Sequence, residues 1–287
     1  MYKKMLVAFD GAESSLDIVR QAARFARSEN SMIDIVTVCP EYQGDLRIQG
    51  DTSVLYNMYE DIRNALNNAV SLCESEGMKV RGHFCIGNPA DVLVEQITSL
   101  GCDLVALGTH SKKLLQSIVI GSVAGTVVRQ TDCDLLVITG NKGLSLQSIF
   151  LAYDASAEAN AAAQQASALA ERYGSRLTAG IAYEMDMEAF SLSPVVERAV
   201  VEKTEQAVEA VKSIVDASDV RDFDVAVRYG NPTHEVLIEE AQKKDAGLVV
   251  IGAGVRSKLS HLLVGGVVHK LVYSSACPVL IVKEQMQ

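Results

Sequence analysis

Short, uninterrupted apolar runs alternate with longer amphipathic segments along this chain. Such runs are typical of strands buried on both faces of a parallel sheet, whereas the amphipathic segments indicate helices. In the first half the pattern predicts strands at 4–9, 32–38, 79–85, 103–107 and 134–138. Helices are expected at 14–30, up to about 77, at 89–100 and from about 121. Strands and helices in alternation predict an α/β fold with a doubly wound parallel sheet.

Several polar residues and prolines stand where helices are expected to begin. Ser14 or Ser15 is suited to cap the first helix, because a serine oxygen can accept a hydrogen bond from a free backbone amide. Pro89 is expected in the first turn of its helix, where the missing amide hydrogen is not needed. Asn231 and Pro232 predict a helix start of the same kind in the second half.

The second half of the chain repeats the first at an almost constant offset. Asp10 and Asp154, Gly108 and Gly252, and Cys133 and Cys277 lie 144 residues apart, and Gly87 and Gly230 lie 143 apart. An offset this long and this regular indicates a duplicated domain. We expect two tandem domains of five strands each, at 1–141 and 146–287, joined by a polar linker at 140–143. The helices of the second copy are expected at 156–173, 194–217, 232–244 and 265–274.

Composition and charge narrow the class of protein. Of the 287 residues, 48% are hydrophobic and 22% charged, which is enough for a sizeable core. The net charge of −10 repels a phosphate backbone, so no nucleic-acid partner is expected. The chain has no apolar stretch of the ~18 residues that a membrane helix needs, so no membrane partner is expected. Asp10 interrupts the first apolar run too early for a signal peptide, and we expect a cytoplasmic protein.

The six cysteines and five histidines do not show the spacing of a metal site. Most of the cysteines stand in apolar runs and none forms a C-x-x-C pair. We expect buried, reduced thiols and no metal site.

The candidate chemistry lies where the strands end. In a doubly wound sheet, ligands bind beyond the carboxyl ends of the strands, at the point where the strand order reverses. Asp10, Val38 and the loop that begins at Gly108 are expected there. Gly121 and Ser122 should begin a helix, whose free amides, dipole and serine hydroxyl attract an anion. Together these residues suit a nucleotide, with the base and ribose near Asp10 and the phosphates at the helix.

On these residues the chain resembles a tandem member of the universal stress protein family. That family's adenine-nucleotide signature is a glycine, two residues, a second glycine, nine residues, and then Gly-Ser or Gly-Thr. Gly108 matches the first glycine, Ser111 stands in place of the second, and Gly121 with Ser122 matches the end. The resemblance spans both copies and implies the adenine nucleotide alpha hydrolase-like fold.

The resemblance implies binding of ATP, ADP or AMP. It leaves open whether magnesium accompanies the nucleotide. It implies that the two copies pair through their last strands as an intramolecular pseudo-dimer, with a homodimer of chains as a further step. The binding residues that it implies in the first copy are Ala8, Asp10, Val38, Leu107, Gly108, Ser111, Gly121, Ser122 and Val123.

The second copy departs from the signature. Asp154 and Gly252 match, but Val255 replaces the second glycine and Gly265-Gly266 replaces Gly-Ser. A β-branched valine suits a tight turn poorly, and Gly266 supplies no hydroxyl. We therefore expect the first copy to be the better nucleotide site. For Gly252, Gly265 and Gly266 we favour a role in turns or packing over contact with a ligand.

Three functions compete. The first is a nucleotide-binding regulatory module of the stress response. The second is an interaction scaffold without nucleotide, because the Cβ of Ser111 resists the positive φ that a glycine would adopt. The third is a slow ATPase, which ranks last because the sequence shows no assembled nucleophile and general base. We expect no catalytic residues and a protein that is not an enzyme.

Overall fold

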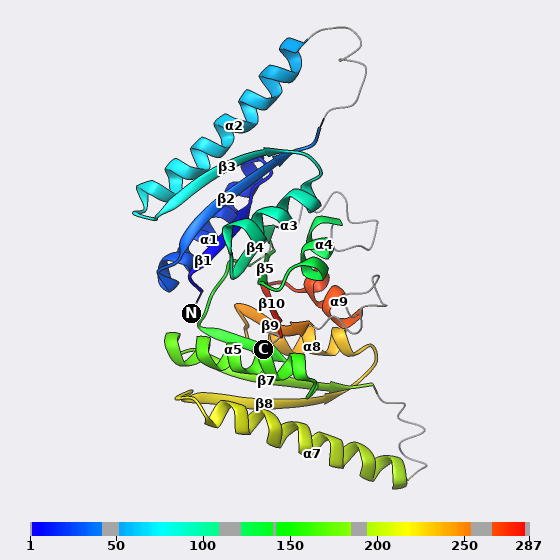
Figure 1. Ribbon diagram of the computed structural model, residues 1–287. Helices are drawn as coiled ribbons and strands as arrows, with labels where there is room; N and C mark the ends of the chain where they lie inside the picture. Colours follow the sequence, from blue (N-terminus) through cyan, green and yellow to red (C-terminus); the bar gives the residue numbers. More distant parts are fainter. Residues whose placement is uncertain are drawn as a thin grey trace. The chain divides into compact units, whose positions relative to one another are not determined.

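The computed structural model describes residues 2–41, 52–108, 122–139, 142–184, 194–253 and 266–284. The chain divides into two compact units, Met1–Gly140 and Asn141–Gln287. We call them unit 1 and unit 2 and describe each by itself (Figure 1).

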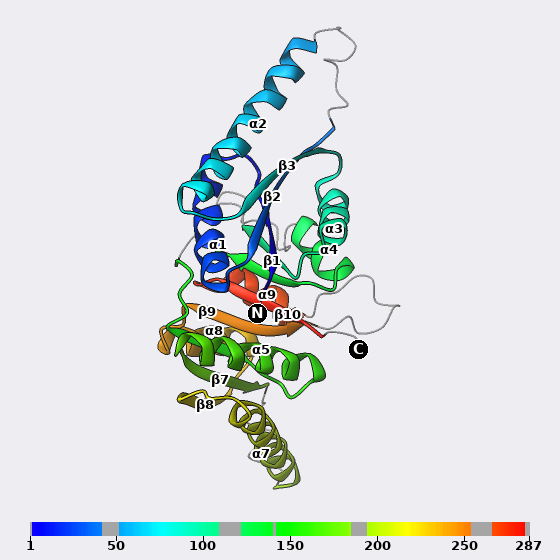
Figure 2. The ribbon, with the colours of Figure 1, turned by 60° about the vertical axis from the view of Figure 1, so that its left-hand side comes forward.

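Unit 1 contains a parallel sheet with the strand order β3-β2-β1-β4-β5. Its strands are β1 (Lys4–Ala8), β2 (Met32–Cys39), β3 (Val80–Ile86), β4 (Leu104–Gly108) and β5 (Asp134–Ile138). Its helices are α1 (Leu16–Glu29), which follows the 3-10 turn η1 (Glu13–Ser15), α2 (Thr52–Ser75), α3 (Pro89–Leu100) and α4 (Ser122–Gln130). Helices α1 and α2 contact each other, as do α3 and α4, and Figure 2 shows the two pairs on opposite sides of the sheet.

Unit 2 repeats this order with a parallel sheet β10-β9-β6-β7-β8. Its strands are β6 (Ser148–Ala152), β7 (Arg176–Tyr183), β8 (Asp222–Tyr229), β9 (Leu248–Ala253) and β10 (Val279–Lys283). Its helices are α5 (Ala157–Tyr173), α7 (Pro194–Asp216), α8 (Thr233–Lys243) and α9 (Gly266–Ser274). The predicted fold class, two doubly wound parallel sheets of five strands, is confirmed.

The cores of the two units are built from the apolar strands. Met5, Leu6 and Val7 of β1 are fully buried, and so is Phe150 of β6. A Cβ added to Gly180 of β7 would overlap the ring of Phe150. The larger side chain on β6 is therefore accommodated by a glycine on the neighbouring strand, as close packing requires.

Several left-handed backbone positions recur in both units. Three positions with positive φ in unit 1 recur 144 residues later in unit 2, although the residue differs, whereas Gly77 (φ 77°) and Gly87 (φ 150°) have no such counterpart among the described residues. The pairs are Gly11 (φ 82°) with Ala155 (62°), Asn30 (58°) with Gly174 (62°), and Gly101 (64°) with Asp245 (52°).

Two predicted helix starts have different outcomes. Pro89 is the first residue of α3, and the side chain of Asn88 accepts hydrogen bonds from the amides of Ala90 (3.0 Å) and Asp91 (3.4 Å). The prediction of a serine cap on α1 is wrong. Ser15 stands at the N-cap but makes no side-chain capping bond, because the 3-10 turn η1 holds it in the right-handed helical region.

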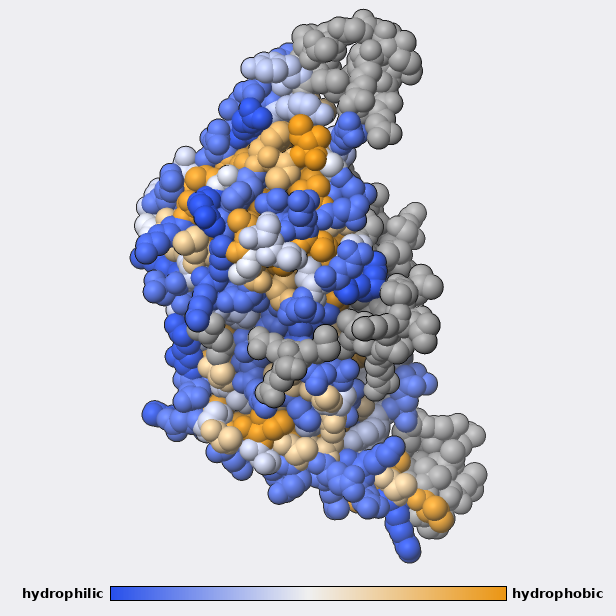
Figure 3. All heavy atoms as spheres, in the orientation of Figure 1, coloured by the Kyte–Doolittle hydropathy of each residue, from blue (hydrophilic) through white to orange (hydrophobic). Residues whose placement is uncertain are grey.

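The predicted buried thiols are largely confirmed. All six cysteines are free, and five are buried, whereas Cys85 is half-buried. Burial raises the pKa of the Cys102 thiol to about 12. None of the helices in the described part of the chain is both long and apolar enough to cross a membrane. Apolar side chains do reach the surface in small groups, for example over β2 and β3 (Figure 3). Ile86, the last residue of β3, is 49% exposed.

Candidate functional site

Each sheet has one point where the strand order reverses. In unit 1 the chain passes from β1 to β2 and β3 on one side and then returns to β4 on the other. Asp10 follows β1 and Gly108 ends β4, so both stand at the same edge of the sheet. Unit 2 places Asp154 and Gly252 at the corresponding edge, after β6 and in β9. This is the position at which doubly wound sheets bind ligands.

The aspartate after the first strand holds the same turn in both units. The Asp10 Oδ1 accepts a hydrogen bond from the amide of Ala12 at 2.9 Å, and the Asp154 Oδ1 accepts one from the amide of Ser156 at 3.0 Å. Both side chains are exposed. The turn contact uses one lone pair of a carboxylate that has about four acceptor sites, so a structural role and a ligand role are compatible.

Three further predicted residues of unit 1, Ala8, Val38 and Leu107, stand at or next to the carboxyl ends of β1, β2 and β4. Ala8, Val38 and Val123 are half-buried, whereas Leu107 is buried at 5% exposure. Ser122 is the first residue of α4. Ser111 and Gly121 lie outside the described residues.

Gly108 and Gly252 share a packing function. A Cβ added to Gly108 would overlap the end of the Ile18 side chain on α1. A Cβ on Gly252 would overlap the backbone carbonyl of Glu158 on α5. Each glycine therefore lets the first helix of its unit approach the strand closely, which is a structural need apart from any ligand.

Unit 2 has a pocket of about 400 Å³ at its reversal point. Its lining includes the predicted residues Asp154, Gly252 and Gly266, together with Ala182 of β7. Gly265 and Val255 lie outside the described residues. The structure thus brings together residues from β6, β7, β9 and α9 that are far apart in the sequence.

The sequence did not single out Ser156, Glu158, Thr233 or Leu237, which also line the pocket. Ser156 is the N-cap of α5, and its Oγ accepts a hydrogen bond from the amide of Ala159 at 3.1 Å. Glu158 follows in the first turn of the same helix. The available signal was position alone, because the first turn after a central strand faces the ligand edge of such a sheet.

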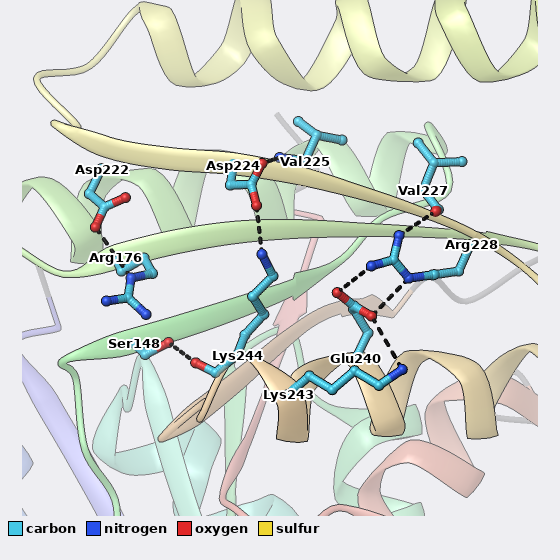
Figure 4. Close-up of polar contacts among 10 residues, drawn as sticks. All are labelled: Ser148, Arg176, Asp222, Asp224, Val225, Val227, Arg228, Glu240, Lys243 and Lys244. Atoms are coloured by element: carbon cyan, nitrogen blue, oxygen red, sulfur yellow. Dashed lines mark hydrogen bonds and ion pairs between the residues drawn. The ribbon is translucent and has the colours of Figure 1, made fainter.

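A polar network holds α8, and with it one wall of the pocket, against β8. The Nε and Nη2 atoms of Arg228 donate hydrogen bonds to the two carboxylate oxygens of Glu240 at 2.8 and 2.9 Å (Figure 4). Lys244 donates to the Asp224 carboxylate at 2.6 Å. Because Glu240 is 2% exposed and bound in a bidentate pair, it fixes the helix that carries Thr233 and Leu237.

Comparisons with known proteins agree with this architecture. The model of the universal stress protein family matches residues 1–139 and 146–283. Universal stress protein MJ0531 of Methanocaldococcus jannaschii is 30% identical over 142 residues, which cover 48% of this chain and 82% of that protein. Universal stress protein A homolog 1 of Coxiella burnetii is 28% identical over 144 residues, which cover 48% of this chain and 96% of that protein.

Two solved structures align with nearly the whole chain. A Pseudomonas aeruginosa UCBPP-PA14 chain described as a universal stress protein has a TM-score of 0.68 at 18% identity, over 98% of this chain and 93% of its own. A universal stress protein of Archaeoglobus fulgidus DSM 4304 has a TM-score of 0.63 at 17% identity, over 98% and 96%. These likenesses concern the fold. With the family model matched in both halves, the chain belongs to the universal stress protein family.

Proposed function

We propose that unit 1 binds an adenine nucleotide at the carboxyl edge of β1 and β4, and that the protein is a regulatory module of the stress response. The observation that carries the proposal is the exposed carboxylate of Asp10 at the point where the strand order reverses. Gly108 lies at the end of β4, the strand that pairs with β1 there. Ser122 is the first residue of α4, and a serine at a helix N-terminus is suited to an anion.

In this proposal each residue has a separate task. Asp10 accepts a hydrogen bond from the ribose or from the base edge. Ala8 and Val38, both half-buried, contact the base. The phosphates bind to the amides around Gly121 and to the hydroxyl of Ser122, where the helix dipole favours negative charge.

A titration with ATP, ADP and AMP tests the proposal. A Gly121→Val variant should lose ~100-fold or more in affinity, because a β-branched side chain blocks the approach of a phosphate to the backbone. Circular dichroism and the melting temperature serve as the control for folding. Retained affinity in this variant would contradict the assignment.

We propose binding, without turnover, as the role of the site. The expected result is phosphate release from ATP at the rate of the buffer alone. Release above that rate that disappears in an Asp10→Ala variant would favour the slow ATPase instead.

One observation favours the interaction scaffold as a second candidate. The long helices α2 and α7 carry exposed apolar side chains, among them Tyr56 at 65% and Val195 at 76% exposure. If the scaffold alone is correct, the natural chain binds no nucleotide, and a Ser111→Gly variant gains binding by restoring the glycine signature.

A further inference from the structure

The sheet of unit 1 ends at β3, a strand that has a neighbouring strand on one side. β3 stands last in the strand order and pairs with β2 along its whole length. The carbonyl of Lys79 and the amide of Gly87 hydrogen-bond to β2, so the odd-numbered residues direct their backbone groups towards it. Backbone groups alternate in direction along a strand, so those of the even-numbered residues point away from the sheet. We call this outward row the β3 edge; its residues are Val80, Gly82, Phe84 and Ile86.

The β3 edge is open. No hydrogen bond joins the outward amides and carbonyls of Gly82, Phe84 and Ile86 to another residue in the described part of the chain. Gly82 and Ile86 are exposed to solvent. Such a row of unpaired backbone groups is a template to which another extended chain can add as a further strand.

The matching strand of unit 2, β8, has the same place in its sheet but a capped edge. The amide of Gly230 bonds to β7, so the odd-numbered residues of β8 point outward. The Asp224 Oδ1 accepts a hydrogen bond from the outward amide of Val225 at 2.9 Å (Figure 4). The Nη1 of Arg228 donates to the outward carbonyl of Val227 at 2.8 Å. Side chains of β8 itself thus occupy two groups that an added strand would need.

Unit 1 lacks both caps. At the position of Asp224, β3 has Arg81, whose Nε and Nη2 donate to the buried Asp34 at 2.8 and 2.9 Å. A guanidinium cannot accept a hydrogen bond from an amide. At the position of Arg228, β3 has Cys85, whose short side chain has no guanidinium to reach a neighbouring carbonyl. The open edge is therefore a property of unit 1 and not of the duplicated fold.

One face of the sheet beside the β3 edge is apolar. Phe84 points to the face of α2, where its ring lies 6.1 Å from the ring of Tyr59, measured between centroids. Ile86 follows on the same face and is 49% exposed. Figure 3 shows apolar side chains at the surface over β3. A strand added here would place every second side chain beside these groups.

The opposite face is basic. Lys79, Arg81 and His83 alternate with the residues of the β3 edge and therefore share the other face. The Arg81 side chain is 50% exposed, and the buried carboxylate of Asp34 balances one positive charge. Lys79 is exposed and forms no ion pair with any described residue, so a positive charge remains in excess. Acidic side chains of an added strand are suited to this face.

We propose that the β3 edge of unit 1 binds an extended peptide segment of a partner protein, in which acidic and apolar residues alternate. Its backbone pairs with the outward groups of Gly82, Phe84 and Ile86. Its acidic side chains lie on the face of Arg81 and its apolar ones on the face of Phe84. The β3 edge is separate from the carboxyl ends of β1 and β4, so the inference does not depend on nucleotide binding.

Charge limits where the acidic residues of the peptide bind. Burial and the nearby carboxylate of Glu95 on α3 raise the pKa of the Cys85 thiol. A second acidic side chain beside Cys85 would be repelled by Glu95. The acidic residues are therefore expected beside Lys79 and Arg81, at the start of β3.

Amide hydrogen exchange of the full chain, read by NMR, tests the pairing directly. The probe is a capped synthetic peptide of the sequence Glu-Val-Glu-Val-Glu-Val. At saturation it should slow the exchange of the outward amides of Gly82, Phe84 and Ile86 about tenfold or more, because they acquire hydrogen bonds. The amides of Arg81 and His83, which face β2, are the internal reference.

Two control peptides separate charge from backbone pairing. The peptide Lys-Val-Lys-Val-Lys-Val keeps the alternation and reverses the charge, and it should bind at least about tenfold more weakly. A Glu-Val peptide that is N-methylated at every residue cannot donate a backbone hydrogen bond. It should leave the exchange of the outward amides unchanged.

A pair of variants at the exposed end of β3 tests the same point in the protein. Ile86→Pro removes one outward amide and leaves the hydrogen bonds to β2 in place, as an edge strand tolerates. Ile86→Ala removes the side chain and keeps the amide. The proline variant should bind the Glu-Val peptide about fivefold more weakly than the alanine variant, as the loss of one hydrogen bond implies. Melting temperatures of both variants are the control for folding.

The proposal is overturned if the Glu-Val peptide leaves the exchange of the outward amides unchanged, or if the Lys-Val peptide binds equally well. Equal affinities of Ile86→Pro and Ile86→Ala would also contradict it. Protection of these amides that grows with protein concentration in the absence of peptide would assign the β3 edge to a second copy of this chain instead.

Discussion

Unit 1 and unit 2 place the same backbone conformation at matching positions and fill it with different residues. A left-handed turn follows the first strand in both, at Gly11 in one and at Ala155 in the other. The first helix ends with a left-handed residue in both, Asn30 and Gly174. Because glycine reaches this region without strain and alanine does not, the fold imposes the conformation and the sequence only makes it more or less costly.

The buried polar groups differ more sharply than the backbone. In unit 1 the fully buried Asp34 of β2 accepts hydrogen bonds from Arg81 at 2.8 and 2.9 Å and contacts the His83 Nε2 at 2.7 Å. The matching residue in unit 2 is Thr178, which is buried and whose Oγ1 has no hydrogen-bond partner among the described residues. A charged network in one copy has thus been replaced by a small polar side chain in the other.

The largest expected effect is at the glycine of the fourth strand in each unit. Gly252→Ala should destabilise the protein by about 3 kcal/mol or more, because the new methyl group would overlap backbone atoms of α5 that cannot move alone. Gly108→Ala should cost about 1 kcal/mol, because its methyl group meets the flexible end of Ile18. Urea unfolding of both variants measures the difference, and equal costs would contradict this account.

The next effect is acid-dependent and belongs to unit 1. Burial raises the pKa of Asp34, but the hydrogen bonds and charges of Arg81 and His83 outweigh it and hold the pKa below the usual 3.8. This stabilisation is therefore present above pH 3.8 and is lost as the pH falls through the lower pKa of the folded state.

Asp34→Thr gives unit 1 the residue that unit 2 has at the matching position. It should lower the free energy of unfolding by about 2 kcal/mol at neutral pH. The cost should shrink as the pH falls below 3.8. Hydrogen exchange of the β2 amides at several pH values measures this dependence. A cost that is the same at every pH would show that packing, and not charge, is the cause.

Smaller effects on stability, opposite in sign in the two units, are expected at the left-handed turn after the first strand. Gly11→Ala should destabilise unit 1 by about 1 kcal/mol through backbone strain, since its Cβ would make only an ordinary 3.6 Å contact with Ile62. Ala155→Gly should stabilise unit 2 by up to about 1 kcal/mol, less the entropy that glycine adds to the unfolded chain. Thermal melts of the two variants should shift in opposite directions, and shifts of the same sign would refute the interpretation.

The smallest effect concerns charge at the edge of unit 1. Ser14→Glu gives unit 1 the acidic residue that unit 2 has at the matching position. Because residue 14 is exposed, water would screen the charge of the introduced glutamate. The affinity of unit 1 for AMP, measured by titration, should therefore fall only about threefold. Ser14→Gln is the uncharged control. An equal loss of affinity in both variants would show that the size of the side chain, and not its charge, is the cause.

The elements of the fold could be predicted closely from the apolar pattern. Helix α3 begins and ends at the predicted residues 89 and 100, because an asparagine cap, a proline and a following glycine mark its ends. The serine cap of α1 could not be predicted, because the preceding 3-10 turn depends on how the chain leaves β1. The turn residue Ala155 gave no signal either, since alanine is ordinarily right-handed.

The candidate site was less accessible to sequence reasoning than the fold. The reversal-point rule located Asp154, Gly252 and Gly266, which the structure brings to one pocket. Glu158 was missed because a glutamate in the first turn of a helix is usually a solvated partner of the dipole. Only the position of α5 beside β9 places it at the pocket.

Mass spectrometry of the small molecules released by denaturing the purified protein tests the central claim most directly. The account predicts about one adenine nucleotide per chain, lost in the Gly121→Val variant, since the proposal assigns phosphate binding to unit 1 alone. Two nucleotides per chain, or one that persists in Gly121→Val, would contradict it, because unit 2, which has Val255 and Gly265-Gly266 in place of the signature residues, would then hold a nucleotide.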